Sequence, residues 1–290
     1  MPICQRLPRS FIISFDVFRR YALTGRELSI AEISKGGEAN MYEHKTKVRY
    51  TESGANGEML LGAVVDCFQN VFHFEAEDAS LDTQNLKKMN LGWFIYFWQI
   101  DIDRYPKCGE DITVGTFVYE DRGSSEGRNF YIKSASDDII IRANSVWSLV
   151  DLTKLQIVRI PNQVMDRNRK MHEDKLDMDH LGRRIRYNGE CSIQKVGEHI
   201  VNRLELDSNR HLNNSEYVKI ALASIANFAP SSVFRLCIEY RKQAVEGDHL
   251  NIFLAREGGS IIDIRSDAGE SFAVMKLFVK GGNARTISTC

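Results

Sequence analysis

Several kinds of sequence feature are scarce or absent in this chain, and each absence excludes a class of protein. No run approaches the roughly 18 to 20 apolar residues that cross a bilayer, and the longest aromatic-rich run extends only from Trp93 to Trp98. Lys and Arg number 38 and Asp and Glu number 39, a formal net charge of −1, so no positive field attracts nucleic acid or an anionic membrane. We therefore expect no membrane span and no nucleic-acid partner.

The six cysteines form neither a metal-binding pattern nor a disulfide framework. They are scattered, with no C-x-x-C spacing and no histidine at zinc-ligand intervals. Reduced thiols in a cytoplasmic compartment fit this distribution best. His172, His180 and the acids between them also lack regular ligand spacing and lie in a charge-rich stretch. We predict no bound metal and no cofactor.

Residues 1–40 are predicted to be an N-terminal extension. They contain Arg6, Arg9, Arg19, Arg20 and Arg26, and Asp16 is the one acid among the first 26 residues. An excess of arginine over acids is typical of organellar transit peptides, but serine is scarce here. We expect a peripheral extension ahead of the folded part, and the alternative is an organellar transit peptide.

Two segments with the same order of elements follow the extension. In residues 41–161, apolar side chains recur at three- and four-residue steps from Leu61 to Phe72 and predict a buried helix. In residues 191–282, an extended segment precedes a helix that contains Val218 and Ile225. Both helices are followed by strand-like runs, at 93–103, 111–119, 129–133 and 139–151, and at 233–241, 250–256, 261–265 and 272–279. One helix followed by antiparallel strands indicates an α+β fold.

The two segments read as an internal repeat joined by a linker. When Asn56 is placed on Asn209, the two helices are in phase, and Gly109 and Gly247 mark matching turns. Two such copies are expected to pack side by side as one pseudo-symmetric body, each sheet protecting the other's edge. The stretch 162–190 between them has 13 charged residues among 29, so we expect it to supply no core face. Residues 283–290 are predicted to be a tail.

The sharpest local feature is the run D-S-N-R-H-L-N-N-S-E-Y from Asp207 to Tyr217. In an extended segment, Asp207, Asn209 and His211 point to one side, so a carboxylate, an amide and an imidazole face the same space. Asn213, Asn214 or Ser215 can cap the following helix, whose free N–H groups and positive dipole end could hold a developing oxyanion. A base beside an anion site suits acyl transfer to water.

A purely structural interpretation competes with the catalytic one. Asp and Asn before a helix favour Asx turns and capping in any protein, and no chemistry is then implied. The internal repeat argues against this, because it places Gly54, Asn56 and Glu58 opposite the three residues. The turn is retained in both copies but the chemical set is not, which favours a functional role for the second copy.

The same run resembles the signature of the acyl-acyl carrier protein (ACP) thioesterases of plant plastids and bacteria, a double hot-dog family. The resemblance covers residues 41–280 and includes Ile102-Asp103-Arg104-Tyr105-Pro106, the run from Ala143 to Trp147, and the run from Ile238 to Lys242. It implies two hot-dog domains, each an antiparallel sheet wrapped around a central helix. The first, 41–161, would bind the acyl chain and the second, 191–282, would carry the catalytic residues.

The resemblance implies hydrolysis of a fatty acyl-ACP thioester, releasing free fatty acid and ending chain elongation. Asp207, Asn209 and His211 become the catalytic set, in which neutral His211 would take a proton from the attacking water. The plant pattern has Glu and Cys where this chain has Gln243 and Ala244. Gln243 is no general base, but it can hydrogen-bond a water or His211 and is kept as a site residue.

Further residues are assigned on the same resemblance. It places the acyl pocket mainly in the first domain, near Phe68 and Phe72, and Arg241 and Lys242 near the site are candidates for docking the acidic carrier protein. Most of the aromatic residues are expected to be ordinary core, with a few lining the pocket. The full set predicted to bind substrate is Phe68, Phe72, Trp93, Trp98, Asn213 and Asn214.

Two other functions stay open at this point. A thioesterase that prefers acyl-coenzyme A would differ only in its partner surface, and a protein that binds acyl thioesters without cleaving them would be consistent with Gln243. Association of two chains as a homodimer is also left open. The plastid stroma, which the resemblance suggests, is the second choice of compartment after the cytoplasm.

Overall fold

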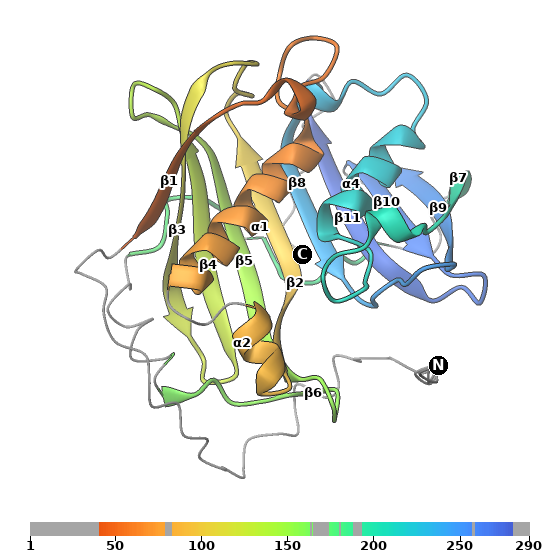
Figure 1. The fold of residues 1–290 in the computed structure, drawn as a ribbon. Helices are drawn as coiled ribbons and strands as arrows, with labels where there is room; N and C mark the ends of the chain where they lie inside the picture. Colours follow the sequence, from red (N-terminus) through yellow and green to blue (C-terminus); the bar gives the residue numbers. More distant parts are fainter. Residues whose placement is uncertain are drawn as a thin grey trace.

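The computed structural model describes residues 41–78, 83–162, 164, 174–179, 181–187, 193–256 and 259–280. The predicted N-terminal extension and C-terminal tail lie outside these ranges, as do His172 and His180. Two halves with the same element order make up the described chain (Figure 1). The first half contains β1 (Tyr42–Lys47), η2 (Tyr50–Glu52), α1 (Leu61–Asp78), α2 (Thr83–Lys88), β2 (Leu91–Ile102), β3 (Asp111–Asp121), β4 (Ser125–Lys133), β5 (Ile139–Asp151) and β6 (Gln156–Ile157). The second contains β7 (Gln194–Ile200), η3 (Arg203–Glu205), α4 (Asn214–Ala223), η4 (Pro230–Ser232), β8 (Val233–Tyr240), β9 (His249–Arg256), β10 (Ser260–Arg265) and β11 (Ser271–Val279).

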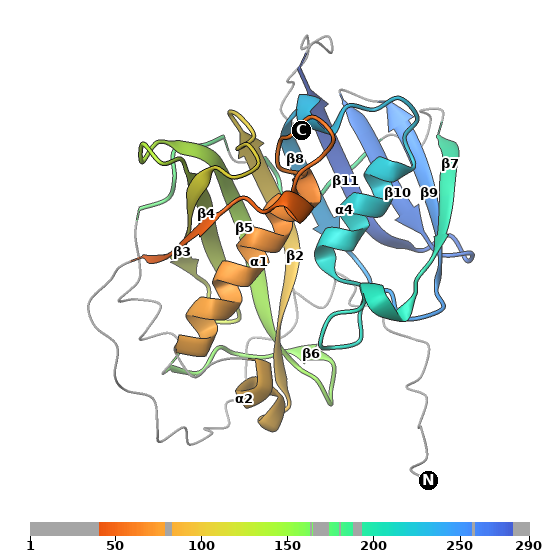
Figure 2. The same cartoon turned by 45° about the horizontal axis from the view of Figure 1, so that its top comes forward.

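The strands of both halves form one continuous antiparallel sheet. Its order is β1-β3-β4-β5-β2-β8-β11-β10-β9-β7, with β6 paired to β5. The halves join where Phe97 to Asp101 of β2 pair with Arg235 to Glu239 of β8. In Figure 2 the helices α1 and α4 lie side by side on the same face of this sheet. The predicted α+β fold, a tandem hot-dog with one helix to each sheet, is confirmed.

The helix α1 is the most deeply buried element of the first half. Ten of its 18 residues are buried, at the apolar spacing that predicted the helix. Phe68 is fully buried against Trp98 and Phe130, with ring centroids 5.7 and 5.4 Å away. Gly62 leaves room for the Lys219 side chain of α4, because a Cβ atom there would lie 2.7 Å from Lys219 Cγ and the lysine would have to shift.

Backbone hydrogen bonds show the internal repeat position by position. Gly54 N donates to Glu58 O as Asp207 N donates to His211 O. The same holds for the bonds that Gly57 and Arg210 donate three residues back, to the carbonyls at 54 and 207. At the turns, Gly109 N donates to Val48 O and Gly247 N donates to Val201 O. The register obtained by placing Asn56 on Asn209 is therefore confirmed.

Of the segment between the halves, residues 181–187 pack on the face of the sheet opposite the helices. Ile185 is 6% exposed and joins a cluster with Phe97, Val146 and Cys237, so the prediction that 162–190 supplies no core face is wrong. Its backbone also satisfies buried polar side chains of the sheet: Leu181 N donates to Gln99 Oε1 at 2.9 Å and Ile185 N donates to Glu239 Oε2 at 2.8 Å. The many charges of this segment hide an apolar alternation through Leu181, Ile185 and Tyr187.

Candidate active site

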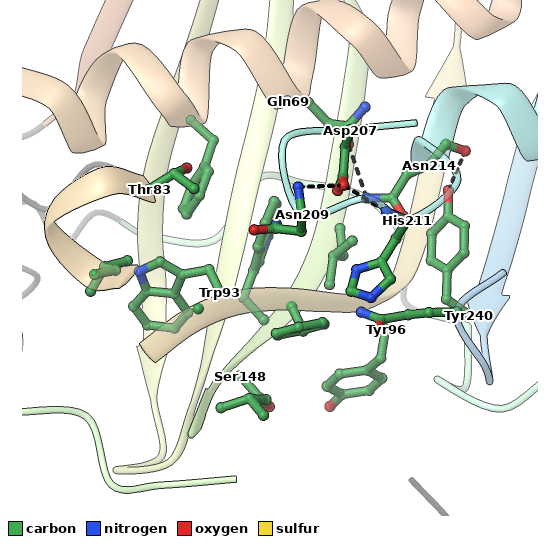
Figure 3. Close-up of a pocket in the computed structure, with 18 of the residues that line it drawn as sticks. Gln69, Thr83, Trp93, Tyr96, Ser148, Asp207, Asn209, His211, Asn214 and Tyr240 are labelled. Atoms are coloured by element: carbon green, nitrogen blue, oxygen red, sulfur yellow. Dashed lines mark hydrogen bonds between the residues drawn. The ribbon is translucent and has the colours of Figure 1, made fainter. Parts of the chain in front are cut away.

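The site lies where β2 and β8 separate. Their pairing stops at Phe97 and Glu239, and β2 has a bulge between Ile95 and Phe97, so the edge of β2 from Leu91 to Tyr96 is free of β8. A cavity fills this opening and extends under α1 and α2 (Figure 3). Its lining includes all four residues predicted to be catalytic, namely Asp207, Asn209, His211 and Gln243.

The loop from Asp207 to His211 is a tight turn and not the extended segment that the sequence suggested. Asp207 Oδ1 accepts hydrogen bonds from the backbone N–H groups of Asn209 and His211, at 2.7 and 3.0 Å. Arg210 adopts a left-handed conformation, with φ of 65°. The Asx-turn interpretation is thus correct for the backbone, and this turn is what directs Asn209 and His211 into the cavity (Figure 3).

The turn leads directly into the N-terminus of α4. Asn213 is the N-cap, as was expected for one of three residues, and its Oδ1 accepts from Ser215 N. Gln69 of α1 reaches across from the first half: its Nε2 donates to Asn213 Oδ1 at 3.0 Å and its Oε1 accepts from Asn214 Nδ2 at 2.9 Å. Tyr240 OH donates to Asn214 O. The positive end of the helix dipole is therefore held beside the turn from Asp207 to His211.

His211 lies in surroundings that favour its neutral form. Burial lowers the pKa of the imidazole, Asp207 partly opposes this by raising it, and Lys87 lowers it further. The Phe94 ring lies 6.3 Å from the imidazole, centroid to centroid. A neutral imidazole in a half-closed cavity can accept a proton from a bound water.

Gln243 is brought to the site by backbone pairing and not by its own side chain. His211 forms a β-bridge with Val245, and Leu212 N donates to Ala244 O at 2.8 Å. Tyr217 of α4 fixes the same loop, because its hydroxyl accepts from Ala244 N at 2.9 Å. Gln243 thus lines the cavity next to His211, where its amide can bond a water.

The two cations predicted to dock the carrier protein are paired within the chain. Arg241 Nη2 donates to Glu239 Oε2 and to Ile185 O, both at 2.9 Å. Lys242 Nζ donates to Glu270 Oε2 at 2.6 Å. Both residues line the cavity, but Arg241 ties the segment after the first half to the end of β8.

The residues predicted to bind substrate divide into two groups. Phe72, Trp93 and Asn214 line the cavity, and Phe72 stacks on Trp147 with ring centroids 4.1 Å apart. Phe68 and Trp98 are fully buried in the core under α1, and Asn213 caps α4. These last three do not contribute to the lining of the cavity.

Some lining residues were missed by the sequence reading. Gln69, His73 and Ala76 share the inner stripe of α1 with Phe72, which the three- and four-residue steps of the helix would have shown. Burial lowers the pKa of His73, while Asp207 raises it. Ser148 and Tyr96 lie in strands, and no pattern in the sequence distinguishes them from core positions.

Among the described residues, no group of three or more His, Cys, Asp or Glu side chains is arranged to hold a metal ion. Within the same ranges, no helix has the length and apolar character needed to cross a membrane.

The architecture defines a double hot-dog protein, and comparison with known proteins identifies the family. The chain belongs to the acyl-ACP thioesterase family: the family model of the N-terminal domain matches residues 39–167 and that of the C-terminal domain matches residues 190–278. The resemblance inferred from the sequence is confirmed. A chloroplastic acyl-[acyl-carrier-protein] hydrolase of Cuphea viscosissima is 28% identical over 183 residues, 56% of this chain and 40% of the relative. A chloroplastic palmitoyl-acyl carrier protein thioesterase of Gossypium hirsutum is 25% identical over 219 residues, 70% of this chain and 52% of the relative.

Solved structures share the whole fold. An acyl-ACP thioesterase from Bacteroides thetaiotaomicron gives a TM-score of 0.73 at 19% identity, over 82% of this chain and 97% of the other. The 12:0-ACP thioesterase from Umbellularia californica gives 0.71 at 18% identity, over 84% and 98%. The chain spans about half the length of the curated relatives named above, but nearly all of these two structures.

Proposed function

We propose that the protein hydrolyses the thioester of a fatty acyl chain carried by ACP, releasing free fatty acid. The observation that carries the proposal is the meeting of His211, Asp207 and Asn209 at the N-terminus of α4, beside a cavity with an apolar part under α1. The named activities of the matched relatives support it.

The geometry supports attack by water. Neutral His211 takes a proton from a water in the cavity, and the water oxygen attacks the thioester carbonyl. Negative charge on the carbonyl oxygen is stabilised by the positive end of the α4 dipole and by the side-chain amides of Asn209 and Gln243. The carbon–sulfur bond then breaks, and the thiolate takes the proton from His211. Asp207 holds the turn and favours the imidazolium that forms in between.

A release assay tests the proposal. Purified protein is incubated with ACP carrying acids of about eight to eighteen carbons, a range that spans roughly 8 kcal/mol of burial at about 0.8 kcal/mol per methylene. We expect free thiol to appear and the rate to depend on chain length. Absence of thiol release with every acid, together with retained binding of acyl-ACP, would favour a protein that binds thioesters without cleaving them.

An acyl-coenzyme A thioesterase is the second candidate, because both carriers present the same pantetheine thioester. Arg241 and Lys242 are paired with Glu239 and Glu270, which lowers the positive charge that they offer to either anionic carrier. Comparing the same acyl group on both carriers decides between them. A kcat/KM at least tenfold higher on ACP supports the leading proposal, and equal values support the second.

The compartment and the oligomeric state remain part of the proposal. Cys67, Cys108 and Cys237 are free thiols, which is consistent with a reducing cytoplasm. The plastid stroma stays as the alternative because the matched relatives are named chloroplastic. Measurement of the molar mass in solution tests for a homodimer.

A further inference from the structure

Ser148 of β5 has a buried hydroxyl group with an unusual position. The residue is 3% exposed, its Oγ has no hydrogen-bond partner within the described chain, and it lines the cavity of the site. A buried hydroxyl that lacks a hydrogen-bond partner destabilises the folded protein, so such a group requires an explanation. Ser145 on the same strand shows the ordinary case, because its Oγ accepts from Trp147 Nε1 at 2.8 Å and donates to Arg128 O at 3.0 Å.

The hydroxyl lies on the side of the sheet away from α1. Trp147 stacks on Phe72 of α1, and neighbouring residues of a strand point to opposite faces, so Ser148 points away from the helix. Figure 3 agrees, since Ser148 and Tyr96 lie on one side of β2 while Gln69 lies on the other. The cavity therefore passes the free edge of β2 and has one part on each side of it.

The two parts differ in chemistry. Under α1 the lining is mostly apolar, with Phe72, Ala76 and Trp147, which suits a hydrocarbon chain. Beyond β2 the lining includes the polar residues Ser148 and Tyr96 and the cation Arg241, next to the ring of Phe94. A thioester substrate has the same two parts, a hydrocarbon acyl chain on one side of the sulfur and a pantetheine arm with amide groups on the other.

We propose that Ser148 binds the pantetheine arm by hydrogen-bonding one of its amide groups. The unpaired hydroxyl receives its partner when substrate binds, and the acyl chain then occupies the part under α1. This assignment rests on the proposed function and identifies a residue that binds the polar half of the substrate. An oxygen on the acyl chain itself is the other source of the same hydrogen bond, and the experiment separates the two.

The test compares Ser148→Ala with the matched control Ser145→Ala on three decanoyl thioesters, those of ACP, of coenzyme A and of thiophenol, which has no amide. For Ser148→Ala we expect the KM to rise about tenfold on ACP and coenzyme A, with no rise on the thiophenol ester. Its Tm should not fall, because no hydrogen bond of the free protein is lost. Ser145→Ala should lower the Tm and leave the KM for each of the three esters unchanged.

Several results would overturn the assignment. An unchanged KM on all three esters, or an equal rise on all three, would show that Ser148 does not bind the arm. A rise seen with 3-hydroxydecanoyl-coenzyme A and not with decanoyl-coenzyme A would assign the hydroxyl to the acyl chain instead. If the unsubstituted protein released thiol from none of the esters, the proposed function itself would fail, which is a different outcome from normal turnover by Ser148→Ala.

Discussion

At the scale of single residues, the site depends on the charge state of His211. Burial favours the neutral imidazole and Asp207 favours the charged one, and burial is the larger effect, so the pKa is below its usual value near 6.5. The histidine is therefore neutral at pH 7 and ready to accept a proton. The charge of Asp207 offsets part of this lowering of the pKa.

This balance predicts a pH dependence. The kcat/KM should rise with pH, with its inflection below 6.5, and be level at neutral pH. Asp207→Asn removes the charge that raises the pKa and should move the inflection to lower pH, whereas Lys87→Gln removes a charge that lowers it and should move the inflection to higher pH. Initial rates of thiol release between about pH 4.5 and 8 measure both shifts. Shifts in the same direction for the two variants would contradict this electrostatic account.

The lowered pKa of His211 also determines in which direction the unfolding free energy changes with pH. The unfolded chain protonates His211 near pH 6.5, while the folded chain does so at a lower pH, so the unfolded state binds more protons between the two values. The contribution of His211 to stability is fully present above pH 6.5 and is lost as the pH falls through this window. His211→Gln should therefore flatten this part of the dependence of the unfolding free energy on pH, as measured by urea titrations.

Removal of the proposed base gives a direct prediction for catalysis. His211→Gln should lower kcat by about 10²- to 10⁴-fold, the usual range for a lost general base, with a small change in KM. The control is His249→Gln, since His249 is exposed and does not line the cavity. Equal kcat values for His211→Gln and the unsubstituted protein would remove His211 from the mechanism.

Residue chemistry was the most predictable part of the site, and side-chain pairing the least. Three of the residues predicted to be catalytic come from the run Asp207 to His211, and all of them line one cavity. The extended conformation predicted for this run was wrong. The Asp207 side chain accepts hydrogen bonds from the backbone within its own turn, and these bonds favour a turn over an extended strand. Likewise, the sequence could not predict that Arg241 donates hydrogen bonds to Glu239 and to the Ile185 carbonyl, because these contacts depend on how the chain packs against the sheet.

At the scale of elements, α1 and α4 are coupled by one side chain. Gln69 bonds both Asn213 and Asn214 at the start of α4, although 144 and 145 residues separate them in sequence. The helix of the first half thus holds the helix start of the second half. Loss of an N-cap bond typically costs about 1 kcal/mol, and Asn213 is the cap.

Gln69→Leu tests this coupling. It leaves Asn213 and Asn214 without their partner, so we expect the unfolding free energy to fall by about 1–2 kcal/mol and kcat to fall more than KM rises. Gln69→Glu keeps an acceptor for Asn214 and should recover part of the kcat. Asn70→Leu is the control, because Asn70 lies next to Gln69 on α1 but is exposed. An identical effect of Gln69→Leu and Asn70→Leu would exclude the coupling.

The element order itself was predictable, since apolar periodicity indicated α1 and the strands, and the repeat indicated that each sheet protects the other's edge. The coupling through Gln69 was not predictable, because no sequence pattern indicates which distant residues a helical glutamine contacts. The buried position of Ile185 was hidden for another reason: the charges around it dominate the composition of the segment, while only alternate side chains meet the sheet.

At the scale of the whole molecule, the two halves share one sheet, and an ion pair connects them where β2 pairs with β8. Arg235 of β8 donates from Nε and Nη2 to the two carboxylate oxygens of Asp101 of β2, both at 2.6 Å. The two side chains are 13% and 11% exposed. Bidentate geometry with little exposure makes this pair costly to break from one side.

Asp101→Ala should therefore destabilise both halves together. It leaves Arg235 charged and largely buried, and we expect the unfolding free energy to fall by about 3–5 kcal/mol. Arg104→Ala, which breaks a pair whose arginine is 47% exposed, should lower the unfolding free energy by at most about 1 kcal/mol.

All three tryptophans lie in the first half, so their fluorescence reports on it alone, whereas hydrogen exchange in β9 to β11 reports on the second. Because the sheet is continuous through β2 and β8, the two probes should show the same lowered midpoint in Asp101→Ala. Two separate midpoints would show that the halves fold independently, and the site between them would then lack the rigid junction on which its geometry depends.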